Sequence, residues 1–159
     1  TQSRSSAASD VYKRQDLKLN KKDNLSHRRF PFTLDHSFDK LIIKLSYAPR
    51  FVPSDEKENI LAEAVEKYLQ DDIYSNEDRT STLDANIENF ITTSLFYERE
   101  FVGAYHNKID DQEIMISQEF SSRGYKKFAI KPGAYEFVLS MHSCNSNVDA
   151  KISVEAIND

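Results

Sequence analysis

The sequence predicts a mainly β protein: a two-layer antiparallel β-sandwich of jelly-roll-like form with one helical insertion. Short segments in which apolar and polar side chains alternate with period two recur along the chain, and turn-forming residues separate them. One stretch, at about residues 54–72, changes to the period of a helix. The chain has 159 residues, of which 39% are hydrophobic and 11% aromatic, so it can fill one core of domain size.

Residues 1–29 are predicted to be a disordered tail or a non-native leader, and the sandwich domain is expected to span residues 30–159. The first stretch lacks apolar periodicity and is rich in Ser, Lys and Arg, a composition that does not support a packed core. Residues 5–15, SSAASDVYKRQ, also resemble a leader that precedes unrelated reading frames in translated short-read assemblies. We therefore expect no binding role for the positive charge of this stretch.

Residues 30–47 are predicted to form two strands joined by a short turn. Apolar residues alternate from Phe30 to Leu34 and again from Leu41 to Tyr47, with turn-forming Asp35-His36-Ser37 between them. In this interpretation His36 is a turn residue whose hydrogen bonds are local.

The helical insertion is predicted from apolar residues that recur at helical spacing from Ile60 to Leu69. Asp55 can cap its start, with Glu58 three residues later. We expect the apolar stripe to pack on the parent domain, and residues 71–89 to form a polar, acidic loop.

The second half of the chain predicts one long strand or two strands within residues 90–108, where apolar residues alternate from Ile91 to Tyr97, and further strands at residues 114–117, 126–131, 135–141 and 151–157. Gly103 interrupts its segment where a bulge or a close backbone approach would fit. Pro132-Gly133 predicts a tight turn before the strand that begins at Tyr135. This makes seven or eight strands, each of which needs a facing sheet because burying one face of a strand gains little more than its ordering costs.

Composition and charge disfavour several functional classes. The net charge is −5, with no basic block interleaved with aromatic residues across a face, so a nucleic-acid partner is not expected. No apolar run is long enough to predict a membrane span or a signal peptide, and the cytoplasm is the default compartment. Cys144 is the single cysteine, which excludes an internal disulfide and a cysteine-based zinc cage.

We expect no catalytic, cofactor-binding or metal-binding residue in this chain. The four histidines lack the H-x-H, H-x-x-x-H and H-E-x-x-H spacings that place two imidazoles on one metal ion. His142 falls on the wetter face of its strand and is predicted to be solvated. Cys144 is predicted to be a turn cysteine, because a residue two positions from His142 is poorly placed to pair with it as a nucleophile.

A resemblance to a known family spans about residues 30–157. A strand ends in Tyr47-Ala48-Pro49 and leads into a charged helix; a Phe-x-Gly-x-x-His element follows at residues 101–106, and a Pro-Gly-x-aromatic turn at residues 132–135. In this order the elements resemble the amino-terminal β-sandwich domain of CehA/McbA-like metallohydrolases, which belong to the PHP (polymerase and histidinol phosphatase) superfamily.

The resemblance implies an accessory domain that packs against a C-terminal PHP-type catalytic domain, a phosphoesterase-like metal-dependent hydrolase. The family's metal site begins with an H-x-H motif on that following domain, so no catalytic residue is carried over to this chain. The alternative is a free-standing carbohydrate- or protein-binding sandwich. Tyr97, Tyr105 and Tyr125 would then form an aromatic platform, and Tyr105, His106 and Tyr125 are the residues expected to face a ligand.

Overall fold

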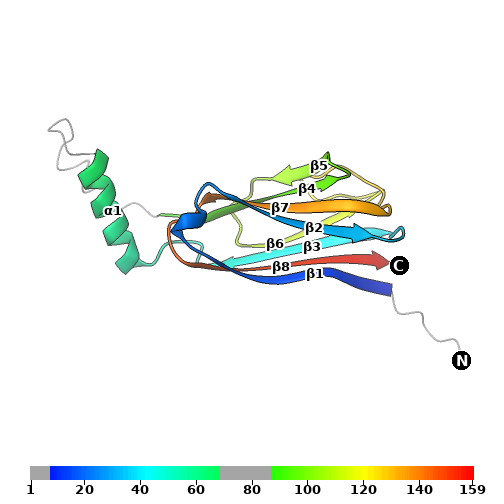
Figure 1. Ribbon diagram of the computed structural model, residues 1–159, viewed down its shortest axis with the longest axis horizontal. Coiled ribbons are helices and arrows are strands. Elements are labelled where there is room, and N and C mark those ends of the chain that lie inside the picture. The colour runs from blue at the N-terminus through cyan, green and yellow to red at the C-terminus, as the bar shows by residue number, and fades with distance from the viewer. Residues whose placement is uncertain (1–7, 69–86) are drawn as a thin grey trace, which may run out of the picture.

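The computed structural model describes residues 8–68 and 87–159, which form two stacked antiparallel sheets with one helix beyond their end (Figure 1). The elements in chain order are β1 (Ala8–Leu19), the 3-10 helix η1 (Lys21–Asp23), β2 (His27–Leu34), β3 (Lys40–Ala48), α1 (Ser54–Tyr68), β4 (Phe90–Tyr97), β5 (Glu100–Tyr105), β6 (Asp111–Ser117), β7 (Gly133–Ser143) and β8 (Val148–Asn158). In the described residues, no helix combines the length and apolar character that a membrane crossing requires.

The strands follow the nested pairing of a jelly roll. Sheet A has the order β1-β8-β3-β6, and sheet B has the order β2-β7-β4-β5. The first strand therefore pairs with the last, the second with the seventh, the third with the sixth and the fourth with the fifth. This arrangement is a single long hairpin rolled into two layers, and it confirms the predicted sandwich.

The core lies between the sheets and comes from the inward-facing alternate residues of both. In β7, Tyr135, Phe137, Leu139 and Met141 are each at most 2% exposed, as the period-two pattern predicts. From sheet A, β3 and β8 supply the facing aliphatic side chains, among them Leu41, Ile43, Leu45, Ile152 and Val154.

The prediction of a disordered leader over residues 1–29 is wrong for residues 8–29. These residues form β1, η1 and the start of β2, and β1 pairs with β8 along its whole length. Leu17 and Leu19 enter the core, and the Tyr12 ring packs edge-on against Phe38 at 5.8 Å. The apolar signal is confined to these few positions, because β1 is an edge strand with one charged face; residues 1–7 lie outside the described part.

The segments at residues 30–47 are strands, as predicted, but they do not pair with each other. β2 joins sheet B through β7, whereas β3 joins sheet A between β6 and β8. The turn at residues 35–37 therefore carries the chain from one layer to the other. Alternation predicts each strand but contains no information about its partner.

The β4–β5 hairpin confirms the close approach predicted at Gly103. A Cβ atom on Gly103 would lie 2.5 Å from the Cα of Tyr125, so only glycine fits there. Glu98 and Arg99 form the two-residue turn with positive φ at both positions, 46° and 69°. This turn geometry is more typical of Asn-Gly, and its sequence gave no turn signal.

Residues 126–131 do not form the predicted strand. Only isolated bridges flank this segment, which runs from the edge of β5 to the edge of β6. Lys126 N donates to the Val102 carbonyl of β5, and Phe128 N donates to the Ser117 carbonyl of β6. The segment thus connects the two sheets and covers the open side of the sandwich between them. A regular strand that is hydrogen-bonded to one sheet could not make both sets of contacts.

The predicted helical insertion is present as α1, which begins at Ser54 and lies beyond one end of the sheets (Figure 1). Leu61 is 6% exposed, while the later side chains of the predicted stripe and most of the predicted 71–89 loop lie outside the described residues. Asn89, which is 1% exposed, fixes the base of the insertion. Its amide donates to the Pro49 carbonyl at 3.0 Å and to Ser146 Oγ at 2.8 Å.

Candidate functional site

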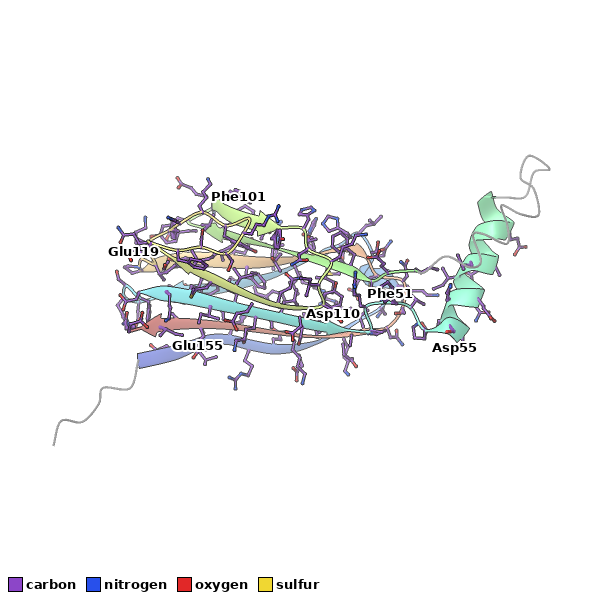
Figure 2. All side chains as sticks on the ribbon, turned by 180° about the vertical axis from the view of Figure 1, so that it is seen from behind. Phe51, Asp55, Phe101, Asp110, Glu119 and Glu155 are labelled. Atoms are coloured by element: carbon purple, nitrogen blue, oxygen red, sulfur yellow. The ribbon has the colours of Figure 1, made fainter. Side chains whose placement is uncertain are left out.

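The two sheets expose outer faces of different chemical character. The four strands of sheet A contain twelve Asp, Glu, Lys and Arg residues, and those of sheet B contain four. On sheet A the charges form cross-strand ion pairs such as Lys18–Asp149 at 2.6 Å and Lys44–Glu113 at 3.7 Å. Phe101 of sheet B and Glu155 of sheet A project on opposite sides of the sandwich (Figure 2). Sheet A therefore has the solvated face, and sheet B is the better candidate for a contact surface.

We call the outer side of sheet B at the end of β7 near α1 the histidine face. It consists of His27, Phe90, Thr92, Ser140 and His142, together with His106 just after β5. Five of its residues come from the neighbouring strands β2, β7 and β4, because Thr92 lies opposite Ser140, and Ser140 lies opposite His27 in the register. No lysine occurs in any strand of this sheet.

Two histidine–hydroxyl contacts organise the histidine face. His27 Nδ1 lies 2.8 Å from Ser140 Oγ, and His142 Nε2 lies 2.8 Å from Thr92 Oγ1. The rings of His106 and His142 are 4.9 Å apart between centroids, and the Phe90 ring lies 5.4 Å from that of His142. The imidazoles are thus held by neutral hydroxyl partners and rings, and no carboxylate pairs with them in the described structure.

The electrostatic setting favours uncharged imidazole at this place. Burial lowers the pKa of His142, and the neighbouring His106 and His27 lower it further. Thr92 is 2% exposed although it points to the outside, so its neighbours already exclude water from it. A face made of hydroxyl groups, imidazole rings and a phenyl ring, with no Lys, Arg, Asp or Glu among its residues, loses little free energy when another protein surface covers it, because few charged side chains must be desolvated.

Within residues 8–68 and 87–159, no three His, Cys, Asp or Glu side chains are grouped so that they could hold a metal ion. Cys144 is 1% exposed, its Sγ lies 3.6 Å from the Ser146 carbonyl, and burial raises the pKa of its thiol. A buried cysteine whose thiol form is favoured is a poor nucleophile.

The three residues expected to face a ligand lie in different environments. Tyr125 is 6% exposed, and its hydroxyl lies 2.6 Å from Thr93 Oγ1 inside the sandwich, so that expectation is wrong for this residue. Burial raises the pKa of Tyr125 to about 12. Tyr105 is partly buried against the core. His106 is exposed and joins the histidine face.

The aromatic platform suggested for a free-standing module does not form from the predicted tyrosines. Tyr97 is partly buried, donates its hydroxyl to the Pro132 carbonyl at 2.8 Å and packs 4.8 Å from the Tyr135 ring. The outer side of sheet B instead has the exposed Phe101 in edge-to-face contact, at 5.8 Å, with the partly buried Phe96. A bulge in the β4–β5 ladder turns these two rings to one side, and alternation alone does not predict it.

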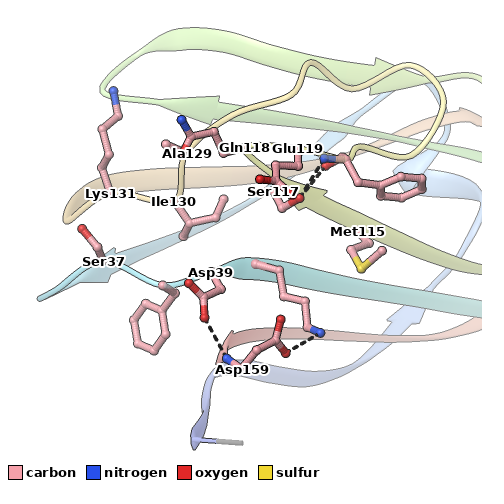
Figure 3. A pocket seen from close by; sticks show the side chains of 13 residues that line it. Ser37, Asp39, Met115, Ser117, Gln118, Glu119, Ala129, Ile130, Lys131 and Asp159 are labelled. Atoms are coloured by element: carbon pink, nitrogen blue, oxygen red, sulfur yellow. Dashed lines mark hydrogen bonds and ion pairs between the residues drawn. The ribbon is translucent and has the colours of Figure 1, made fainter.

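Two hollows complete the candidate surfaces. One, of about 620 Å³, lies on the outer side of sheet B at the end away from α1, where Phe96, Arg29 and Glu136 line it and the last two form an ion pair of 2.6 Å. The other, of about 610 Å³, lies between the start of β3 and the β6–β7 connection (Figure 3). There Asp159 N donates to Asp39 Oδ2, and Lys40 pairs with the Asp159 carboxylate at 2.8 Å.

No protein-family model and no curated protein matches the chain. Among solved structures, it is similar to a crystal structure from Sulfurospirillum deleyianum, with 13% sequence identity and a TM-score of 0.33. The match covers 92% of this chain and 98% of the other.

Proposed function

We propose that this chain is a non-catalytic accessory domain that packs against a PHP-type metal-dependent hydrolase domain of the same protein through the histidine face. The observation that supports it is the difference between the two outer faces: sheet A is covered by ion pairs, and sheet B is nearly free of charge at its α1 end. The identity of the partner domain rests on the order of the Tyr47-Ala48-Pro49, Phe-x-Gly-x-x-His and Pro-Gly-x-aromatic elements.

The physical reason for choosing this face is the cost of desolvation. An interface on sheet A would have to remove water from exposed lysine–carboxylate pairs. The attraction between the paired charges compensates only a small part of that desolvation cost. An interface on the histidine face would cover imidazole rings, two hydroxyl groups and the Phe90 ring, with Lys108 and its partner Glu88 at the rim. Interfaces commonly have this arrangement of an uncharged centre and a charged rim.

Histidine footprinting tests the proposal directly. The reading frame should first be sequenced beyond Asp159, where an in-frame domain containing an H-x-H motif is expected. Diethyl pyrocarbonate should then modify His27, His106 and His142 in the 159-residue chain but not in the full-length protein. His36, in the β2–β3 turn, is the internal control and should react equally in both. Equal modification of the three histidines in the two proteins would exclude the histidine face as the interface.

A pair of matched serine substitutions provides a second readout. Ser94 on β4 and Ser153 on β8 are both half-buried and lie on the outer sides of sheets B and A. Ser94→Arg places a charge next to the histidine face and should restore histidine modification in the full-length protein, whereas Ser153→Arg should not. If both variants behave like the unsubstituted protein, the two domains do not meet at this face.

The second candidate is a free-standing carbohydrate- or protein-binding module. The hollow lined by Phe96, Arg29 and Glu136 favours it, because a partly exposed ring beside paired charges can contact a sugar or a peptide. A stop codon directly after Asp159, together with binding in a glycan screen that Phe96→Ala abolishes, would support this candidate over the first.

A further inference from the structure

A group of lysine and arginine side chains lies along the side of the sandwich that the β6–β7 connection covers. We call Arg123, Lys126, Lys127 and Lys131 the basic edge. All four are exposed, and no acidic residue occurs between Glu119 and Glu136. This concentration of positive charge occurs in a chain whose net charge is −5.

The backbone that carries the basic edge is fixed at several points. Tyr125 and Ile130 are buried, at 6% and 2% exposure, and anchor the segment at both ends. Gly124 packs against the Ala104 carbonyl in a conformation with φ of 89°, and Ala104 N donates to the Gly124 carbonyl at 3.0 Å. The four cationic side chains therefore project from a segment held to both sheets, which reduces the entropy lost when a ligand binds them.

These cations are not used in ion pairs within the part of the chain that the structure describes. Lys18, Lys40 and Lys44 of sheet A each pair with a carboxylate, but none of the basic-edge residues does. Three of the four lie over aromatic rings instead. Arg123 is 6.0 Å from the centre of the Tyr105 ring, Lys126 is 5.7 Å from that of Phe101, and Lys131 is 4.9 Å from those of both Tyr97 and Phe128.

The partners Tyr97, Phe101 and Tyr105 come from β4 and β5, away from the basic edge in sequence, so local sequence patterns did not indicate this surface. Phe101 is 50% exposed, so part of its ring remains open beside Lys126. An open ring next to unpaired cations can contact the C–H face of a sugar while the cations bind acidic groups.

We infer that the basic edge binds an acidic polysaccharide, a linear glycan that carries carboxylate groups. Its carboxylates would pair with Lys126, Lys127 and Lys131, and one sugar ring would lie on Phe101. A nucleic acid fits less well, because single strands are bound by stacking successive bases on several open rings, and of the rings beside the basic edge Phe101 alone is exposed while Tyr97, Tyr105 and Phe128 are partly buried. This inference does not depend on the proposed packing through the histidine face.

The test compares two triple variants of the same 159-residue chain. Lys126→Gln/Lys127→Gln/Lys131→Gln removes three charges from the basic edge, and Lys18→Gln/Lys40→Gln/Lys44→Gln removes three from sheet A. Both lower the net charge equally. Binding of polygalacturonate is measured by isothermal titration calorimetry at low salt, with neutral amylose and a thymidine oligonucleotide as the other two probes.

We expect polygalacturonate to bind, with about a tenfold weakening in the basic-edge variant, which lies within the range that three exposed ion pairs together contribute. The sheet A variant should bind like the unsubstituted chain, and amylose should not bind. Equal weakening in both variants would show unspecific attraction to charge, and tighter binding of the oligonucleotide would identify a nucleic-acid surface. Either result, or the absence of polygalacturonate binding, overturns the inference.

Discussion

The role of β1 can be tested with one core substitution, Leu19→Ala. Leu19 is 2% exposed, pairs with Val148 of β8 and belongs to the core between the sheets. The change removes three carbon atoms, which is about 2.4 kcal/mol of transfer free energy at about 0.8 kcal/mol per carbon. The cavity left behind adds to this, so we expect a loss of about 3 kcal/mol in the free energy of unfolding.

For a chain of this size, a loss of about 3 kcal/mol corresponds to a decrease of roughly 6–12 °C in melting temperature. Thermal and urea denaturation followed by circular dichroism measure both quantities. The control is Val11→Ala in the same strand, where Val11 is 51% exposed and a change within about 0.5 kcal/mol is expected. If the two variants unfold alike, β1 does not belong to the folded sandwich and the prediction of a leader was right.

Three further predictions follow from the packing and the titratable groups. Gly103→Ala should destabilise the fold by about 1–3 kcal/mol or more in urea denaturation, because its Cβ would meet the Tyr125 backbone; a change smaller than this would contradict the close approach. Cys144 should react with a thiol reagent only as fast as the chain unfolds, since it is 1% exposed, and rapid reaction of the folded protein would contradict its burial. The lowered pKa of His142 means that the unfolded chain binds that proton more readily, so stability should fall as the pH decreases below about 6.5. His142→Gln should reduce this dependence and His36→Gln should not.

The alternation of apolar residues predicted much of the sandwich because most strands have one face in the core. β7 is the clearest case: its odd-numbered residues from Tyr135 to Met141 are all in the interior. The helix at residues 54–68 was predicted from a change in the period of the apolar residues. The close approach at Gly103 was predicted because glycine has no side chain. Each of these signals depends only on residues that are close together in the sequence.

The surfaces depend on contacts between distant segments, and these could not be predicted from local patterns. His106 and His142 appear unrelated in the sequence, yet the pairing of β4 with both β5 and β7 brings them together. Residues 126–131 have the alternation of a strand, but hydrogen bonds to two different sheets hold them in an irregular path. The burial of Tyr125 could not be predicted either, because Thr93, the hydrogen-bond partner of its hydroxyl group, is 32 positions away in the sequence.

The nested strand pairing also determines the order in which the ladders can close. Tyr97 and Glu100 pair across a two-residue turn, whereas Ala8 must meet Asn158 at the other end of the chain. Because the entropy cost of closing a loop grows with its length, we expect the β4–β5 hairpin to form first and the β1–β8 ladder last. During synthesis β1 leaves the ribosome before β8, so it has no strand partner in its sheet until the last strand of the sandwich follows.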